Sequence, residues 1–302
     1  MTNDQQSQTY IIRSSGEKCQ EKIVSGGFFA WLYNHPDGIK FRPRLMENRL
    51  LHCLIEKFAN SSISRHLVEK FAQKAGIDIN EAEKPFHRFR SLNDFFTRKL
   101  KKTARIIDFS NDVFIAPGDG KLLVFDKISP DSVLPIKGLQ VCLKSLLNDS
   151  QLSAAFSEGS AMVLRLYLMD YHRIHFPCDG IPHKPVKIKG HYFSVSPIKG
   201  NNLDFYSMNK RSYTGFSSKF FGEIAFLDIG GFLIASIKHL FEPEICVTKG
   251  KEKSLFQFGG STLVVLFQKN RIIFDHDLVE NSKAGVETYV KLGERIGRQF
   301  SA

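Results

Sequence analysis

The chain has 302 residues, of which 42% are hydrophobic, and its formal net charge is +11. This length and hydrophobic content exclude a disordered chain and suit one large domain or two modest ones. The basic balance favours a polyanionic partner, either nucleic acid or an anionic membrane surface, with a solvated basic surface as the alternative.

The chain begins with a polar stretch. Residues 1–23 predict a flexible polar N-terminus, and residues 1–27 lack the apolar segment of a signal peptide. Residues 26–33 are short, apolar and aromatic, so they suit either insertion into a membrane interface or packing on the core. The sequence has no uninterrupted run of about 18 apolar residues, so we expect no transmembrane helix and only peripheral membrane contact.

Two amphipathic helices are predicted next. Residues 45–58 carry apolar side chains at helical spacing, namely Leu50, Leu51, Leu54, Ile55 and Phe58. Ser61 or Ser62 can cap a second helix, whose apolar side would carry Ile63, Leu67, Val68 and Phe71. Residues 37–105 hold sixteen Lys and Arg against eight Asp and Glu. We therefore expect residues 24–104 to form a helical, basic, membrane-docking region.

The pattern changes after about residue 105 to short β-rich runs. Gly, Pro and Asp separate these runs, which lie at 113–116, 121–128, 162–169, 223–229, 232–237 and 262–267. Gly230 and Gly231 predict a hairpin turn between two of them. The expected fold class is α+β, with a helical N-terminal region followed by a β-rich catalytic core over residues 105–302.

A glycine pair followed by a hydroxyl, Gly259-Gly-Ser-Thr262, precedes the last predicted strand of that list. Glycine opens conformations closed to other residues and removes bulk around its carbonyl, so the Ser261 oxygen could attack the carbonyl of Gly260. A turn before a strand is the alternative interpretation.

Three further side chains could serve such a hydroxyl. Asp119 stands between two glycines at a predicted turn, and His172 and His175 follow a predicted strand. An aspartate that orients a histidine, which in turn activates Ser261, has the logic of nucleophilic catalysis. Each feature alone also has a structural explanation, because Asp-Gly is a common turn pair.

A metal site is the alternative use of the two histidines. Their spacing of three suits metal binding on a helix, with Asp179 as a third ligand, but Pro177 and Gly180 argue against a helix here. The five cysteines are scattered without CxxC spacing, which argues against a zinc finger or disulfide framework and favours a reducing compartment.

Several segments, in this order, resemble the phosphatidylserine decarboxylase family of pyruvoyl-dependent enzymes. They are Phe89 to Lys101 with Arg105, Pro117-Gly-Asp-Gly120, Tyr171-His-Arg-Ile-His-Phe-Pro177 with Asp179-Gly180, Phe256-Gln-Phe-Gly-Gly-Ser-Thr262, and Lys291 to Gly297. The chain departs from the family where many members carry leucine at Gly259 and glutamate at Lys210, and where Asp228 to Phe232 is bulkier.

The resemblance implies that the chain cleaves itself between Gly260 and Ser261. His175, oriented by Asp119, would take the Ser261 proton and start an N-to-O acyl shift. Elimination and loss of ammonia would then leave a pyruvoyl group at the former Ser261. The products would be a β chain (1–260) and an α chain (261–302), which remain associated.

The resemblance also implies the reaction and its partners. The pyruvoyl group would form a Schiff base with phosphatidylserine and accept electrons as carbon dioxide leaves, giving phosphatidylethanolamine. His172 would return the proton, and no metal is expected. The enzyme would act as a peripheral protein on an anionic membrane, at the cytoplasmic face of the cell membrane, with a homodimer left open.

Competing hypotheses predict different behaviour. A basic lipid-binding module without catalysis would stay in one piece, and a metal hydrolase using His172 and His175 would need zinc. A third alternative is a family member that matures but acts on another amine. Nucleic acid is not expected as a partner, because no nucleic-acid-binding signature is found.

Overall fold

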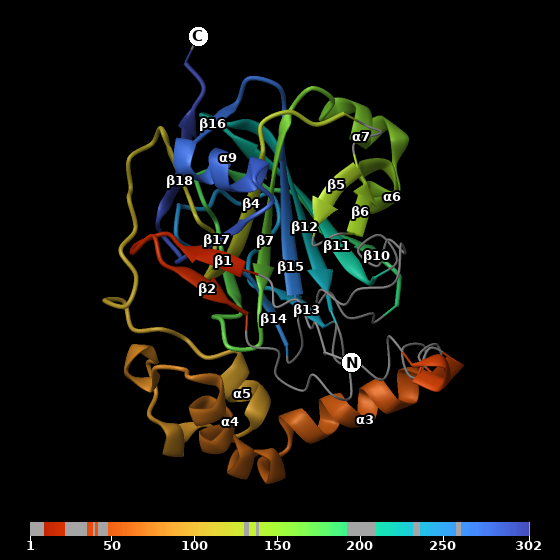
Figure 1. Ribbon diagram of the computed structural model, residues 1–302, viewed down its shortest axis with the longest axis vertical. Coiled ribbons are helices and arrows are strands. Elements are labelled where there is room, and N and C mark those ends of the chain that lie inside the picture. Colours follow the sequence, from red (N-terminus) through yellow and green to blue (C-terminus); the bar gives the residue numbers. More distant parts are fainter. Residues whose placement is uncertain are drawn as a thin grey trace, which may run out of the picture.

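The computed structural model describes residues 9–21, 35–38, 40–41, 48–129, 133–136, 139–191, 209–231, 236–257 and 261–301. It is a mixed α/β fold in which large sheets dominate and the helices are few and short (Figure 1). The β-rich core expected after residue 105 is therefore present. In the described ranges, no helix has the length and apolar character needed to cross a membrane.

The largest sheet among the described residues has ten strands, in the order β10-β11-β12-β15-β7-β4-β17-β1-β2, with β9 paired to β11. Neighbouring strands are antiparallel except β1 and β17, which are parallel. The bounds are β1 Thr9–Ile12, β2 Lys18–Gln20, β4 Gly120–Phe125, β7 Ser160–Leu166, β9 Ile181–Pro182, β10 Val186–Ile188, β11 Arg211–Ser218, β12 Gly222–Gly230, β15 Ser261–Phe267 and β17 Glu287–Val290.

Three smaller sheets complete the described strands. They are β13 (Ile237–His239) with β14 (Glu252–Phe256) and β8 (Arg173–His175), β16 (Ile272–Phe274) with β18 (Arg295–Gln299) and β3 (Val113–Ile115), and β5 (Val133–Ile136) with β6 (Leu139–Cys142). Because β13 pairs with β14 and not with β12, the hairpin expected at Gly230 and Gly231 is not formed by the described residues. Residues 232–235 lie outside them.

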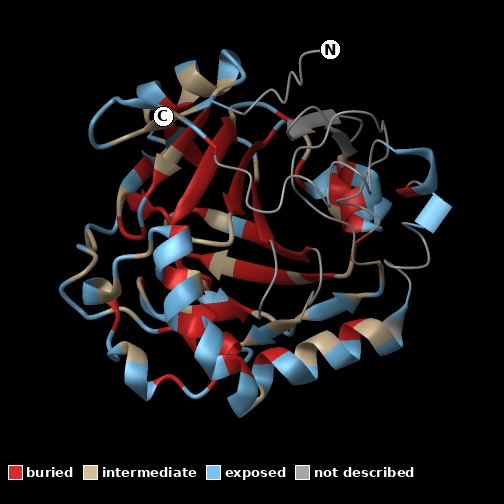
Figure 2. Ribbon diagram, turned by 60° about the horizontal axis from the view of Figure 1, so that its bottom comes forward, coloured by how far each residue is buried: buried red, intermediate tan, exposed pale blue. Residues whose placement is uncertain are grey.

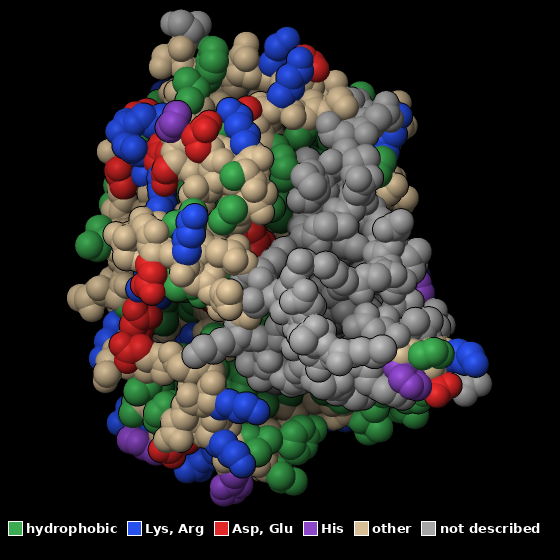
Figure 3. All heavy atoms as spheres, viewed as in Figure 1, with side chains coloured by type: hydrophobic (Ala, Val, Ile, Leu, Met, Phe, Trp, Pro, Cys, Tyr) green, Lys and Arg blue, Asp and Glu red, His purple; other side chains and the backbone are tan. Residues whose placement is uncertain are grey.

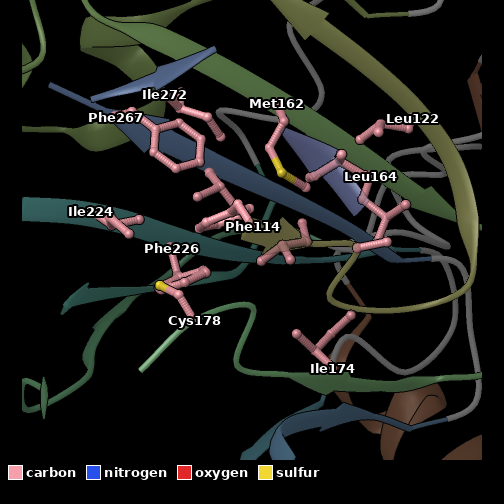
Figure 4. Packing of buried hydrophobic residues seen from close by; sticks show 14 of the residues in the cluster. Phe114, Leu122, Met162, Leu164, Ile174, Cys178, Ile224, Phe226, Phe267 and Ile272 are labelled. Carbon is pink, nitrogen blue, oxygen red and sulfur yellow. The ribbon is translucent and has the colours of Figure 1, made fainter. Parts of the chain in front are cut away.

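The main core lies around the central strands of the large sheet. Every residue of β7 and β15 is buried, which fits their continuous apolar runs. Phe114 packs edge-on against Phe267 with ring centroids 4.9 Å apart, and Met162, Leu164 and Phe226 belong to the same cluster (Figure 4). This packing makes β15 a rigid support for the hydroxyl at its first residue.

The helices are short. In the described range 48–100 they are α3 (Arg49–Asn60), α4 (Val68–Ala75) and α5 (Leu92–Phe96), with 3₁₀ helices at Ser62–Leu67, Ile79–Glu81 and Phe86–Arg88. Later helices are α6 (Leu143–Leu147), α7 (Ser150–Ala155) and α9 (His276–Lys283). A continuous helical region over 24–104 is not evident in the part of that range that the structure describes, because turns separate these segments. The apolar segment 26–33 lies outside it.

The second predicted helix starts differently from the expectation. After α3, which the Asn48 side chain caps by accepting from the Leu51 amide, the chain forms a 3₁₀ helix before α4 begins. A 3₁₀ helix has about 3.0 residues per turn instead of about 3.6, so the apolar side chains do not share one face. Ile63 is accordingly 71% exposed, whereas Val68 is 2% exposed.

The expectation of a flexible lead-in is wrong for residues 9–20, which form β1 and β2. β1 pairs in parallel with β17, which lies near the other end of the chain. Just after β2, Glu21 is buried and pairs with Arg165 at 2.8 Å and with Lys121 at 3.2 Å. The polar composition hid this segment, because its stability comes from backbone pairing and buried ion pairs instead of an apolar pattern.

Candidate active site

Ser261, the predicted nucleophile, is the first residue of β15. It stands opposite Leu166 of β7 and Gly230 of β12, and it is 1% exposed. Sheet pairing on both sides fixes its backbone, and burial keeps its hydroxyl away from bulk water. Gly260, the other residue of the predicted cleavage site, lies outside the described residues.

His172 is the imidazole that contacts this hydroxyl. Its Nδ1 lies 3.3 Å from Ser261 Oγ, and its Nε2 lies 2.9 Å from the carbonyl oxygen of Tyr167. A carbonyl can only accept, so Nε2 carries the proton and Nδ1 offers a lone pair to the serine. Phe96 of α5 stacks on the ring with centroids 3.8 Å apart, which holds the imidazole in this orientation.

Burial sets the protonation state of His172. Desolvation, and then the positive charge of Arg98, lower its pKa to about 3. The imidazole is therefore neutral near pH 7 and can accept a proton, although it is a weak base.

His175, the predicted processing base, has other partners. Its Nδ1 donates to the carbonyl oxygen of Gly250 at 2.7 Å, and its Nε2 lies 3.0 Å from the hydroxyl of Tyr171. Burial lowers the pKa of His175 below its usual value, and the hydrogen bond to Gly250 and the charge of Glu252 oppose this lowering only in part.

Asp119 is bound by a guanidinium, and no hydrogen bond joins it to either histidine in the described structure. Arg105 Nε donates to Asp119 Oδ1 at 3.0 Å, and the backbone amide of Leu292 donates to the same oxygen at 2.8 Å. Arg105 also pairs with Glu81 at 2.8 Å. The expected direct contacts from Asp119 to His175 and from His175 to Ser261 are therefore not found among the described residues.

The turn that carries Asp119 depends on glycine. A Cβ at Gly120 would lie 2.6 Å from the backbone oxygen of Arg165, so no larger residue fits without movement of the sheet. This close approach brings β4 against β7 and fixes the position of the preceding aspartate.

Arg98, Arg105, Phe96 and Tyr171 belong to this site, although sequence analysis assigned them no role. All four stood in the segments that carry the family resemblance, which is the signal that could have found them. The contacts of Phe96 and Arg98 could not be inferred, because they join segments more than 70 residues apart in the chain.

Asp228, noted as a departure from the family pattern, has a local partner. It forms a fully buried ion pair with Lys253 of β14 and accepts a hydrogen bond from Ser254 Oγ at 3.0 Å. A buried carboxylate needs such partners, so Lys253 and Ser254 explain how strand β12 can hold a buried charged residue.

The two histidines do not form a metal centre with a third ligand. The described residues contain no group of three or more His, Cys, Asp or Glu side chains that could hold a metal ion. Asp179, the suggested third ligand, accepts a hydrogen bond from the backbone amide of Lys249 at 2.6 Å.

Comparison with known proteins places the site in a family. The family model described as phosphatidylserine decarboxylase matches residues 92–298. The chain is 38% identical over 294 residues to a phosphatidylserine decarboxylase proenzyme of Chlamydia trachomatis serovar L2, covering 97% of this chain and 98% of that protein. The chain belongs to the phosphatidylserine decarboxylase family. A proenzyme of the same name from Clostridium botulinum strain 657 is 37% identical over 289 residues, covering 95% of this chain and 98% of that protein.

The range matched by the phosphatidylserine decarboxylase model begins at α5 and ends within β18. It includes Asp119, His172, His175 and Ser261, together with Phe96 and Arg98. The relatives align over nearly the whole chain, so the similarity to them extends beyond the range that the family model matches.

Proposed function

We propose that this chain is a proenzyme that cleaves itself between Gly260 and Ser261 and then converts phosphatidylserine to phosphatidylethanolamine and carbon dioxide. The observation that carries the proposal is the Ser261 hydroxyl, buried at the start of β15 and facing the lone pair of His172. Family membership supplies the reaction class, and a buried, oriented hydroxyl is what the first step needs.

Self-cleavage uses this hydroxyl as the nucleophile. A base takes the Ser261 proton, the oxygen bonds to the Gly260 carbonyl carbon, and the peptide C–N bond breaks with its nitrogen protonated. Removal of the Ser261 α-proton then breaks the Cβ–Oγ bond and frees the carboxylate of Gly260. The resulting enamine becomes an imine, and water replaces its nitrogen as ammonia, leaving a pyruvoyl ketone.

The surroundings of Ser261 suit a pyruvoyl group. The position is buried, and the His172 ring, on which Phe96 stacks, lies against it. The pyruvoyl group supplies an electron sink for decarboxylation. The chain's own residues must exclude water, position the substrate and return a proton.

The two imidazoles differ in contact and in basicity. His172 touches Ser261, but no carboxylate raises its pKa, which is about 3. His175 does not touch Ser261, and burial lowers its pKa, but the hydrogen bond to Gly250 and the charges of Glu252 and Asp119 oppose this lowering. We therefore assign self-cleavage to His175 with Asp119, and proton return during turnover to His172. This assignment requires the Ser261 hydroxyl to turn towards His175 in the uncut chain.

Matched histidine variants test this division of labour. We expect His175→Ala to stay uncut, and His172→Ala to be cut but to decarboxylate roughly 10²- to 10⁴-fold more slowly, the usual contribution of a general acid or base. Intact mass reports cleavage, and release of carbon dioxide from phosphatidylserine reports turnover. An uncut His172→Ala protein together with a cut His175→Ala protein would reverse the assignment. The histidine that contacts Ser261, His172, would then be the base for self-cleavage.

We also propose a peripheral position on the cytoplasmic face of the cell membrane, and the surface of α3 supports the membrane contact. Leu50, Leu54 and Phe58 are spaced by four residues on one face of this helix and are 70%, 54% and 46% exposed. Figure 2 shows exposed and partly buried residues alternating along α3, and Figure 3 shows hydrophobic and basic side chains together at the end of the molecule where the N-terminal helices lie. An apolar helix face with basic neighbours suits the interface of an anionic bilayer.

The activity itself is tested with the unmodified chain and a Ser261→Ala variant. Wild-type protein added to vesicles that contain phosphatidylserine should release phosphatidylethanolamine and carbon dioxide, and the variant should release neither. Treatment with borohydride should abolish the wild-type activity, because it reduces the ketone. The wild-type protein could instead be cleaved, leave phosphatidylserine unchanged and decarboxylate another amino acid derivative. This result would contradict the proposed substrate but support pyruvoyl-dependent decarboxylation.

A further inference from the structure

Arg98 carries a buried positive charge next to the candidate active site. It follows α5 and the cap residue Thr97, and it is only 6% exposed. Its guanidinium lies over the ring of Phe95, with the Cζ atom 5.2 Å from the ring centroid. A stacked, buried guanidinium is held in a defined orientation, which suits it to bind a ligand.

The hydrogen-bonding capacity of this guanidinium is only partly used. Its Nη2 donates to the carbonyl oxygens of Met169 and Asp170 at 3.3 and 3.4 Å, both of which are long hydrogen bonds. Its Nη1 is buried and has no hydrogen-bond partner among the described residues. No carboxylate within the described residues forms an ion pair with Arg98, although more distant ones influence its pKa. A buried cation with an unused donor needs an anion.

Arg98 and the Ser261–His172 pair belong to one cluster. Phe96, two residues before Arg98, stacks on the His172 ring. The carbonyl oxygens that Arg98 binds belong to Met169 and Asp170, shortly before His172 in the chain. The charge of Arg98 is also close enough to lower the pKa of His172. An anion on Arg98 would therefore belong to the molecule that reacts at Ser261.

We propose that Arg98 binds the phosphodiester of the substrate, an inference that rests on the proposed function. An amino-phospholipid of the serine type carries two anions, a carboxylate and a phosphodiester. A cation paired with the carboxylate would stabilise the substrate more than the transition state, because that charge leaves as carbon dioxide. The phosphodiester keeps its charge throughout the reaction, and a guanidinium matches its oxygens. Arg98 would thus select phospholipids over free amino acids.

The experiment uses the full chain and two non-reacting probes. Glycerophosphocholine carries the phosphodiester but no primary amine and no carboxylate, and 3-methoxypropionate carries the carboxylate but no phosphate. Their affinities are measured by calorimetry for wild type, Arg98→Gln, Arg98→Lys and the control Arg90→Gln, whose side chain is 88% exposed. Intact mass is recorded for each protein, together with KM and kcat for phosphatidylserine.

We expect Arg98→Gln to be cut normally and to bind glycerophosphocholine roughly 10- to 100-fold more weakly, as for one lost charge-assisted hydrogen bond. Arg98→Lys should regain part of this affinity, Arg90→Gln should match wild type, and 3-methoxypropionate should bind all four proteins equally. The rise in KM should exceed the fall in kcat, since the contact is present in both substrate and transition state.

Three results would overturn the proposal. The first is unchanged glycerophosphocholine affinity in Arg98→Gln, and the second is a loss confined to 3-methoxypropionate, which would place the carboxylate on Arg98. The third is that both Arg98 variants stay uncut, which would make Arg98 part of folding or processing. Failure of the proposed function is separate, because it would appear as a wild-type chain that is neither cut nor active.

Discussion

The proton on His172 is placed by a backbone carbonyl. Because the carbonyl oxygen of Tyr167 can only accept, it holds the proton on Nε2 and leaves the Nδ1 lone pair facing Ser261. Asp119 receives its own hydrogen bonds from Arg105 and from the amide of Leu292. At the scale of single residues, a neutral imidazole therefore faces the hydroxyl, and Asp119 is held by Arg105 and a backbone amide instead of by a histidine.

Replacing Asp119 tests its proposed role in self-cleavage. Asp119→Asn keeps the size of the side chain but removes the negative charge that raises the pKa of His175. We expect self-cleavage to slow roughly 10²- to 10⁴-fold, the range for loss of general base catalysis. The uncut fraction is followed by denaturing gel electrophoresis after synthesis. An Asn variant that is cut at the wild-type rate would remove Asp119 from the processing machinery.

The buried His172 also predicts how stability depends on pH. Its pKa falls from 6.5 to about 3 on folding, so between these values the unfolded chain binds the proton that the folded chain lacks. The free energy of unfolding should therefore decrease as the pH is lowered below about 6.5. The contribution of His172 to this decrease is at most about 1.4 kcal/mol per pH unit.

A His172→Gln variant provides the comparison, because glutamine does not titrate. The free energy of unfolding is measured with denaturant at pH 7 and at pH 5 for two uncut proteins, Ser261→Ala and Ser261→Ala/His172→Gln. The protein that keeps His172 should lose more stability between the two pH values than the one that lacks it. Equal losses would mean that the imidazole does not titrate as its burial indicates.

Single elements of the fold serve different steps of the proposed reaction. β15 holds Ser261 in the centre of the large sheet, whereas α3 presents an apolar face to solvent. The amphipathic pattern of α3 was readable from the sequence, because its apolar residues recur at helical spacing. That this face is exposed could not be read, because the same pattern normally packs against a core.

The exposed face of α3 should bind membranes. Leu50→Gln/Leu54→Gln should fold normally, because both side chains are already exposed, and should bind serine-lipid vesicles at least about 10-fold more weakly. Vesicle flotation measures this, with Ile273→Gln as the control, an equally simple change of an exposed residue on β16. Undiminished binding of the α3 variant would locate the docking surface elsewhere.

The α chain should stay bound after cleavage. β15 pairs with β12 on one side and with β7 on the other, over seven residues each, and all of its own residues are buried. The two products should therefore co-elute in size-exclusion chromatography without denaturant and separate only in denaturant. A free α chain under native conditions would contradict this role of β15.

At the scale of the whole molecule, the sequence predicts where strands lie better than it predicts which strands pair with one another. The buried runs that became β3, β4, β7, β12 and β15 were recognisable because turn residues bound continuous apolar stretches. β1 and β2 were missed, because β1 is completed by β17 from the opposite end of the chain. Pairings between distant segments leave no local pattern.

The same limit applies to the site. The residue types Asp119, His172, His175 and Ser261 could be chosen from the sequence because their motifs resemble one family. The sequence could not show which histidine faces the serine, because the turn after β7 decides where each ring points. The contact made by His172 and the engagement of Asp119 by Arg105 follow only from the assembled sheets.

The central claim is that the folded chain cuts itself and gains a ketone at its new terminus. Intact mass of freshly folded wild-type protein, before and after reduction with borodeuteride, tests it most directly. The account predicts two chains that meet between Gly260 and Ser261, of which only the smaller takes up deuterium, at its first residue. A single unreduced species of 302 residues would contradict it.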